Sequence, residues 1–170
     1  VLSLQIGDGD LLIGYPDGRI ERPLRADTGL IGEETYSLCL PDAVGRFRTA
    51  TLWHQPGDDW PDFITATTDG VAKSYRDDAG FERAIAQLRH NAATDWDALI
   101  AALPSWLDDV STHGSGDDST ICIALRASPT EWMISGSVMM SVIRVANRIV
   151  PTSASEIPII PADQPKLAIP

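Results

Sequence analysis

FITATTDG, residues 63–70, is a short run of β-prone residues that ends abruptly at Asp-Gly. This pattern predicts a buried strand, and its last two residues place the Asp69 carboxylate on a tight turn at the margin of a sheet. A second unit, GSGDDST at 114–120, leads into the apolar run 121–125, so here the acids precede the strand. If the two strands are antiparallel neighbours, Asp69 and Asp117 meet at one rim. Paired carboxylates at such a rim suit a hard cation such as Mg²⁺ or Mn²⁺.

The length and composition favour one globular unit with a tail. A chain of 170 residues can bury one sizeable core, and 44% hydrophobic with 22% charged residues is ordinary for a folded protein. We expect an α+β domain over residues 1–126 and an extension over 127–170. Within the extension, 132–150 reads as an amphipathic helix or an extra strand, and the proline-rich end from 151 to 170 as an irregular tail.

The net charge of −11 bears on the partners of the protein. Nucleic acid is bound through Lys and Arg, so this charge argues against nucleic acid as a partner. It is compatible with a metal site, and equally with a merely soluble, self-repelling acidic surface. No signal segment begins at Val1, and the longest apolar stretch, 132–143, is shorter than the ~20 residues of a spanning helix. We expect no membrane partner, and the sequence does not indicate the oligomeric state.

The two cysteines, Cys39 and Cys122, each lie in a strand-like apolar run. A free cysteine in such a run behaves as a small buried hydrophobe. Neither cysteine has a nearby base in sequence, so we expect both to be structural and reduced. Reduced cysteines indicate a cytoplasmic compartment.

The first seventy residues read as a meander of antiparallel strands. Short alternating runs are separated by turn signals. The strands are expected at 2–6, 11–15, 19–21, 33–40 and 47–53, and in the run from 63 that stops at Asp69-Gly70. The turn Pro16-Asp17-Gly18 makes a hairpin of the second and third runs. Because Val1 enters a strand pattern directly, we expect the beginning of the sequence to be a cut edge.

After Gly70 the spacing of apolar residues changes from two towards 3.6, which predicts helices. We expect a first helix capped by Asp77 or Asp78, a second capped by Thr94, and a break or a new start at Pro104. Their apolar stripes are Phe81, Ala84, Ile85 and Leu88, then Trp96, Leu99, Ile100 and Leu103, then Trp106, Leu107 and Val110. Such stripes are the faces that helices bury on a sheet, so they predict core and not a site.

Three acidic motifs resemble those of one known family. Thr68-Asp69-Gly70 after an apolar strand, and Asp117-Asp118-Ser119-Thr120 before another, look like the two C-terminal motifs of the metal-dependent type-2C Ser/Thr protein phosphatases. IGDGD at 6–10, before the apolar run 11–15, is similar to that family's Gly-Asp-Ser-Arg strand motif. The order and context of the motifs agree over roughly the first 125 residues.

This resemblance implies a four-layer α-β-β-α sandwich of antiparallel sheets, N-terminally incomplete in this chain. It implies hydrolysis of phosphoserine or phosphothreonine on a phosphorylated protein substrate in signalling, dependent on Mn²⁺ or Mg²⁺. Such enzymes clamp two divalent ions with acidic side chains, so no side chain acts as nucleophile. By motif, Asp69 and Asp117 are metal ligands, and Asp8 resembles the acid that helps to hold an additional, weaker metal. Each acid has an alternative role in which it satisfies backbone donors at a turn.

The sequence also departs from the family pattern. The first metal motif, of the Asp-Gly-His-Gly type and preceded by a phosphate-binding Arg, does not occur, so we expect this chain alone to be inactive. Lys73 stands where many members place another acid, and an ammonium there repels a third cation. The histidines His54, His90 and His113 show no metal-ligand spacing.

Two other functions remain open. A non-catalytic relative would use the same fold as a binding module, and the sequence upstream of Val1 would discriminate it from the enzyme. An N-terminal-nucleophile hydrolase has a layered sandwich too, but it needs Thr, Ser or Cys at position one, and Val1 carries no nucleophile. No Gly-x-Ser-x-Gly elbow occurs either.

Overall fold

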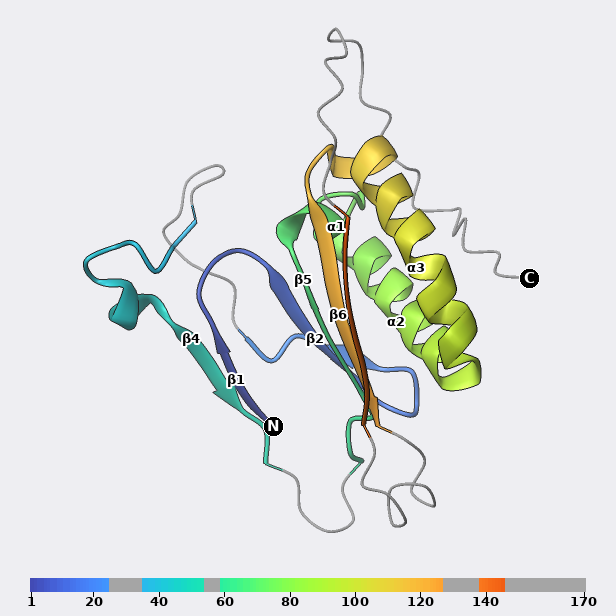
Figure 1. Cartoon of the computed structure of the whole chain (residues 1–170). Helices are drawn as coiled ribbons and strands as arrows, with labels where there is room; N and C mark the ends of the chain where they lie inside the picture. The colour runs from blue at the N-terminus through green and yellow to red at the C-terminus, as the bar shows by residue number, and fades with distance from the viewer. Residues whose placement is uncertain (25–34, 54–58, 127–137, 146–170) are drawn as a thin grey trace, which may run out of the picture.

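The computed structural model describes residues 1–24, 35–53, 59–126 and 138–145, the last range by its backbone alone (Figure 1). These residues form an α+β fold with two antiparallel sheets. The strands are β1 (Leu2–Gln5), β2 (Asp10–Gly14), β3 (Ile20–Glu21), β4 (Arg48–Thr51), β5 (Phe63–Thr67), β6 (Ser119–Arg126) and β7 (Val138–Val145). The α-helices are α1 (Asp69–Ala72), α2 (Asp78–Thr94) and α3 (Trp96–Val110), and short helical turns cover Ala43–Arg46 and Ser111–Ser115.

The larger sheet has the order β3-β2-β5-β6-β7, with every neighbouring pair antiparallel. Thr67 at the end of β5 pairs with Asp10 at the start of β2 on one side and with Ile121 near the start of β6 on the other. The prediction that β5 and β6 are antiparallel neighbours is therefore confirmed. One rim of the sheet gathers the start of β2, the end of β5 and the start of β6, and it lies at the top of Figure 1.

The helices α2 and α3 lie side by side on one face of the larger sheet (Figure 1). Alternate residues of β5 and β6 face them, because successive side chains of a strand point to opposite faces. The buried core between the two layers comprises Leu12, Phe63, Val71, Phe81, Ile85, Leu88, Ala92, Leu99, Leu103, Leu107, Val110, Ile121, Ile123 and Leu125. The predicted helical stripes therefore contribute to the core. No helix within the described ranges is long and apolar enough to cross a bilayer.

The helix starts were predicted in part. Asp77 caps α2 by accepting a hydrogen bond from Gly80 N at 2.7 Å, as the sequence indicated. The expectation that Thr94 caps the next helix is wrong. Asp95 caps α3 by accepting from Ala98 N at 2.9 Å, while the Thr94 hydroxyl donates back to a carbonyl in the last turn of α2.

The expected break at Pro104 is also wrong, since α3 continues through it. A proline inside a helix removes one backbone donor and leaves the carbonyl four residues earlier, at Ile100, without its partner. Pro104 is exposed, so water can serve that carbonyl. The stripe on the other side of α3 stays continuous, with Leu103 and Leu107 both buried, and holds the helix on the sheet.

The expectation of a single meander is wrong. β1 pairs with β4 in a separate two-stranded sheet, with Leu2 opposite Thr51, and does not pair with β2. After β1 the chain bends at Gly7, whose φ of 98° is in the left-handed region, and so leaves one sheet for the other. In Figure 1 the β1–β4 pair lies on the opposite side of the larger sheet from α2 and α3.

The strand expected at 33–40 is absent from its described part, 35–40, and residues 33 and 34 lie outside the described residues. Successive turns occupy this segment, including a hydrogen bond from Leu40 N to Ser37 O at 3.2 Å. Cys39 is consequently exposed, which corrects the expectation that it is buried. Cys122 lies in β6, where it is half-buried, and both thiols are free.

At the C-terminal end, the strand alternative for 132–150 is the correct one, because β7 pairs with β6 along its whole length. Residues 132–137 and 146–150, and the proline-rich end from 151 to 170, lie outside the described residues.

Candidate functional site

The acidic units predicted from the sequence meet at the rim formed by the end of β5 and the start of β6. Thr68 joins them with three hydrogen bonds: its N donates to Thr120 O at 3.1 Å, its hydroxyl donates to Asp118 O at 3.0 Å, and it accepts from Thr120 N at 2.9 Å. The residue before Asp69 is thereby bonded to the residue after Asp117. The structure brings the two predicted ligands to one rim.

Asp69 is the first residue of α1 and not part of a simple turn. Its Oδ1 accepts a hydrogen bond from Gly70 N at 2.9 Å, and its Oδ2 lies 2.6 Å from Lys73 Nζ. The ammonium comes from one helical turn further on, the spacing at which opposite charges on a helix meet. Lys73 therefore places a positive charge where the family pattern has an acid, and it holds the Asp69 carboxylate.

Gly70 is required for a reason that the sequence did not reveal. A Cβ on this residue would lie 2.7 Å from Asp118 O and 3.2 Å from Asp117 Cβ, closer than side chains normally approach. The Asp-Gly pair was interpreted as a turn signal. In the structure the missing side chain lets the loop that carries Asp117 pack directly onto α1.

Asp117 is exposed on the loop before β6. Its Oδ1 accepts from Asp118 N at 2.8 Å, and its backbone carbonyl accepts from the Ser111 hydroxyl at 2.7 Å. The loop therefore fixes the backbone of Asp117, while Oδ2 has no hydrogen bond among those that the structure describes for this residue.

Asp8, the third predicted ligand, is exposed on the bend between β1 and β2. The next residue, Gly9, packs so closely on β5 that a Cβ there would lie 2.5 Å from Thr67 O. Asp8 thus stands beside the end of β5, near the rim but outside the contacts that link Asp69 to the Asp117 loop.

Asp10 was not among the predicted site residues, yet it faces Thr67 directly across the β2–β5 pair. Burial raises the pKa of Asp10, Arg22 opposes this effect, and the charges of Asp78 and Asp69 add to it. Arg22 Nε lies 3.5 Å from Asp10 Oδ1, and Arg22 Nη1 lies 3.3 Å from Asp78 Oδ1. Asp10 is the last acid of the IGDGD motif, so its place two residues after Asp8 was the signal available in the sequence.

Carboxylates are the oxygen ligands that Mn²⁺ and Mg²⁺ prefer, and Asp69 and Asp117 supply them at one rim. Within the described ranges, however, no three His, Cys, Asp or Glu side chains converge as a metal site would require. The pair therefore fits a divalent ion as part of a ligand set, with other ligands needed to complete it.

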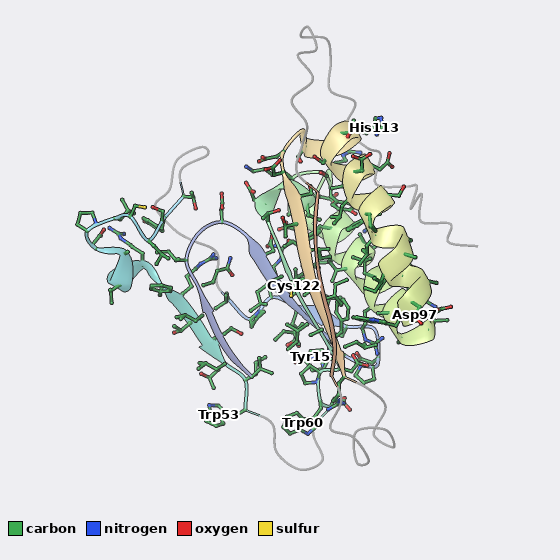
Figure 2. All side chains as sticks on the ribbon, in the orientation of Figure 1. Tyr15, Trp53, Trp60, Asp97, His113 and Cys122 are labelled. Carbon is green, nitrogen blue, oxygen red and sulfur yellow. The ribbon has the colours of Figure 1, made fainter. Side chains whose placement is uncertain are left out.

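The described histidines take no part in this rim. His113 Nδ1 lies 2.8 Å from Asp109 Oδ1 on the same helical surface, and Figure 2 shows it at the C-terminal end of α3. His90 is exposed on α2, and His54 lies outside the described residues.

Comparison with known proteins gives one positive finding. A family model described as Protein phosphatase 2C matches residues 1–108, a range that includes Asp8 and Asp69 and ends before Asp117. No curated protein and no solved structure matches the chain. The family match covers well over half of the 170 residues and agrees with the acidic motifs that the fold brings to one rim. The chain belongs to the protein phosphatase 2C family.

Proposed function

We propose that this protein contributes the C-terminal part of a metal-dependent phosphatase that hydrolyses phosphoserine or phosphothreonine on proteins. Family membership supports phosphatase-type chemistry. The observation that carries the metal dependence is the bonding of the Asp69 and Asp117 segments through Thr68, because it assembles two carboxylates from distant parts of the chain. We propose Asp69 and Asp117 as ligands of the ions, with Asp8 contributing to an additional, weaker site.

The bound Mn²⁺ or Mg²⁺ would supply Lewis-acid polarisation of the phosphate ester and activation of the attacking water. The acidic residues of this chain would hold and orient the ions. Thr68 fixes the spacing of the two strand ends, and Gly70 allows the Asp117 loop to approach α1. Arg22 partly neutralises the half-buried Asp10 beside them, which limits the negative charge at the rim.

We propose further that the complete domain is a four-layer sandwich, to which residues 1–126 contribute. Residues 127–170 form an extension, whose strand β7 adds to the edge of the larger sheet. Two surfaces of the described part support this proposal. On β1, Leu2 and Leu4 are 76% and 63% exposed, which is unusual for strand leucines. On the larger sheet, Leu11 and Ala66 form a cross-strand pair on the face opposite the helices and are partly or fully exposed. Further structure, including the first metal motif, would cover these faces. We propose a cytoplasmic location, which the two free cysteines support.

Activity assays on two lengths of chain test the proposal. With p-nitrophenyl phosphate and Mn²⁺, the 170-residue chain should be no faster than its Asp69→Asn variant, because two-metal phosphoryl transfer needs both ions fixed. A protein extended upstream through the first metal motif should gain metal-dependent turnover that Asp69→Asn abolishes. A phosphoserine or phosphothreonine peptide then tests the substrate class.

Two outcomes would contradict parts of this proposal. No turnover by the extended protein with any divalent ion would assign the fold to a binding module. Strong Mn²⁺-dependent activity of the 170-residue chain, abolished by Asp69→Asn, would show that the first metal motif lies within it in a form that differs from the family pattern.

A further inference from the structure

Ser74 is a buried hydroxyl that lies between α1, α3 and the loop before Asp117. It is 4% exposed. Its Oγ lies 2.8 Å from Gly70 O and 3.1 Å from Val110 O, and it accepts a hydrogen bond from Ser115 N at 3.0 Å. A serine hydroxyl has one proton and two lone pairs, so it can donate to one of these carbonyls at a time while it accepts from the amide. The Ser74 side chain therefore contacts α1 at Gly70, α3 at Val110 and the loop before Asp117 at Ser115.

The chain bends at Gly114 to reach this hydroxyl. Gly114 lies in the helical turn Ser111–Ser115 but has a non-helical conformation, with φ −101° and ψ −108°. A Cβ on Gly114 would lie 2.4 Å from Ser74 Oγ and 2.5 Å from Ser74 Cβ. Only a glycine permits the approach of the turn to Ser74.

Ser115 continues the connection to Asp117. Its hydroxyl donates to Gly70 O at 2.8 Å and accepts from Asp117 N at 3.2 Å. The Gly70 carbonyl, one residue after Asp69, thus faces both serine hydroxyls. Two hydrogen bonds through Ser115 connect the helix of Asp69 with the backbone of Asp117.

An ordinary structural role explains only one of these contacts. A serine in a helix commonly donates to the carbonyl four residues earlier, as Ser74 does to Gly70. This common helical hydrogen bond does not account for the hydrogen bond from Ser115 N to Ser74 Oγ, for the bend at Gly114, or for the second hydroxyl group, that of Ser115, that donates to Gly70 O. These contacts all converge on the loop that carries Asp117, and neither serine touches a carboxylate oxygen in the hydrogen bonds described for them.

We propose that Ser74 and Ser115 are positioning residues that set the separation of Asp69 and Asp117 for cation binding. The inference rests on the proposed function, in which these two acids are metal ligands. Groups that hold metal ligands in place commonly change metal affinity by about 10–100-fold when they are removed. Because the serines act through the backbone, their loss should weaken binding without removing a ligand.

The test measures Mn²⁺ affinity of the full 170-residue chain by titration calorimetry. Ser74→Ala and Ser115→Ala should each weaken Mn²⁺ binding by about tenfold. Ser115→Thr keeps a hydroxyl at this half-buried position, so it should bind Mn²⁺ as tightly as the wild type. Thr65→Val is the matched control, because Thr65 is also buried and donates to a backbone carbonyl, Cys122 O at 2.9 Å, away from the acids. Thr65→Val should lower the melting temperature about as much as the serine variants do, but its Mn²⁺ affinity should stay within about twofold of the wild type.

Amide hydrogen exchange gives a readout that needs no metal. Ser74→Ala should speed exchange at the Asp117 amide by about tenfold relative to Thr65→Val at equal global stability, although Ser74 does not contact that amide. If Asp69→Asn binds Mn²⁺ as well as the wild type, the assignment of Asp69 as a ligand in the proposed function fails. If the wild-type chain binds no Mn²⁺, the upstream ligands are required for binding. In either case the exchange data alone decide whether Ser74 positions Asp117. Unchanged exchange in that case overturns the positioning role. The positioning role is also overturned if the wild type binds Mn²⁺ and neither alanine variant weakens that binding. An equal loss of Mn²⁺ affinity in Thr65→Val overturns it too.

Discussion

Replacing Lys73 by Gln should tighten the binding of Mn²⁺ at Asp69. The Lys73 ammonium lies 2.6 Å from Asp69 Oδ2 at the i,i+4 spacing. A divalent ion that uses this oxygen must displace the ammonium and then tolerate a positive charge nearby. Removing that charge while keeping a polar side chain of similar length relieves both costs.

The size of the effect follows from the geometry. Opposite unit charges 2.6 Å apart attract by about 1.6 kcal/mol in bulk water. The Lys73 side chain is 46% exposed and flexible, so this figure is discounted to about 0.5–1 kcal/mol. Once displaced to roughly 8 Å, the ammonium still repels a divalent ion by about 1 kcal/mol in water, and by about a third of that at physiological salt. The sum is about 1 kcal/mol, which corresponds to about fivefold tighter binding.

Titration calorimetry of the 170-residue chain with Mn²⁺ measures this change, and Arg83→Gln is the control. Arg83 is exposed on α2 beside a groove formed with Gly18, so this variant makes the same change in net charge outside the acidic rim. It should change affinity by less than about twofold, and the gain of Lys73→Gln should shrink as salt is raised. Unchanged or weaker binding by Lys73→Gln at low salt, with Asp69→Asn still abolishing binding, would refute the competition between Lys73 and the cation.

Three further predictions concern stability and the thiols. Arg89→Met should lower the free energy of unfolding in urea by about 3 kcal/mol, because it leaves the Asp62 carboxylate unpaired where the two now form a bidentate contact at 2.8 and 2.5 Å; a loss below about 1 kcal/mol would be inconsistent with that pairing. The raised pKa of Asp10 means that the fold favours its protonated form. The stability that this protonation adds is fully present below the ordinary pKa of 3.8 and is lost as pH rises through the pKa of Asp10 in the folded protein. Asp10→Asn should remove that decline from a pH series of melting curves, and an identical pH dependence in both proteins would contradict it. The exposed Cys39 should react with a thiol reagent in the native state faster than the half-buried Cys122, and finding no free thiol in unreduced protein would contradict the expected reduced state.

The sequence predicted those features that depend on local pattern. The strand that ends at Asp69, the strand that follows Asp117 and the apolar faces of the helices were all visible as periodicity. The antiparallel pairing of β5 with β6 then placed the two acids at one rim. Each of these predictions follows from the spacing of apolar side chains along the chain and from the antiparallel direction of neighbouring strands.

The remaining features depend on contacts between distant segments. Whether β1 pairs with β2 or with β4 depends on the bend at Gly7, whose positive φ carries the chain from one sheet to the other. Pro104 was interpreted as a break because its effect on the backbone is local, whereas the packing of Leu103 and Leu107 on the sheet keeps α3 continuous. The close approach at Gly70 and the burial of Asp10 likewise appear only when the neighbouring loop and strand are in place.

The hydrogen bond from the Thr68 hydroxyl to Asp118 O has a consequence for folding kinetics. Its partners are 50 residues apart in sequence, with both long helices between them. Contacts of such high sequence separation form late, because the chain must first lose the entropy of closing a long loop. The acidic rim should therefore assemble only when β6 docks beside β5. A cation that needs both acids would bind only after the sheet has formed, and not in the folding transition state. Mn²⁺ should therefore slow the unfolding of this chain and leave its folding rate unchanged.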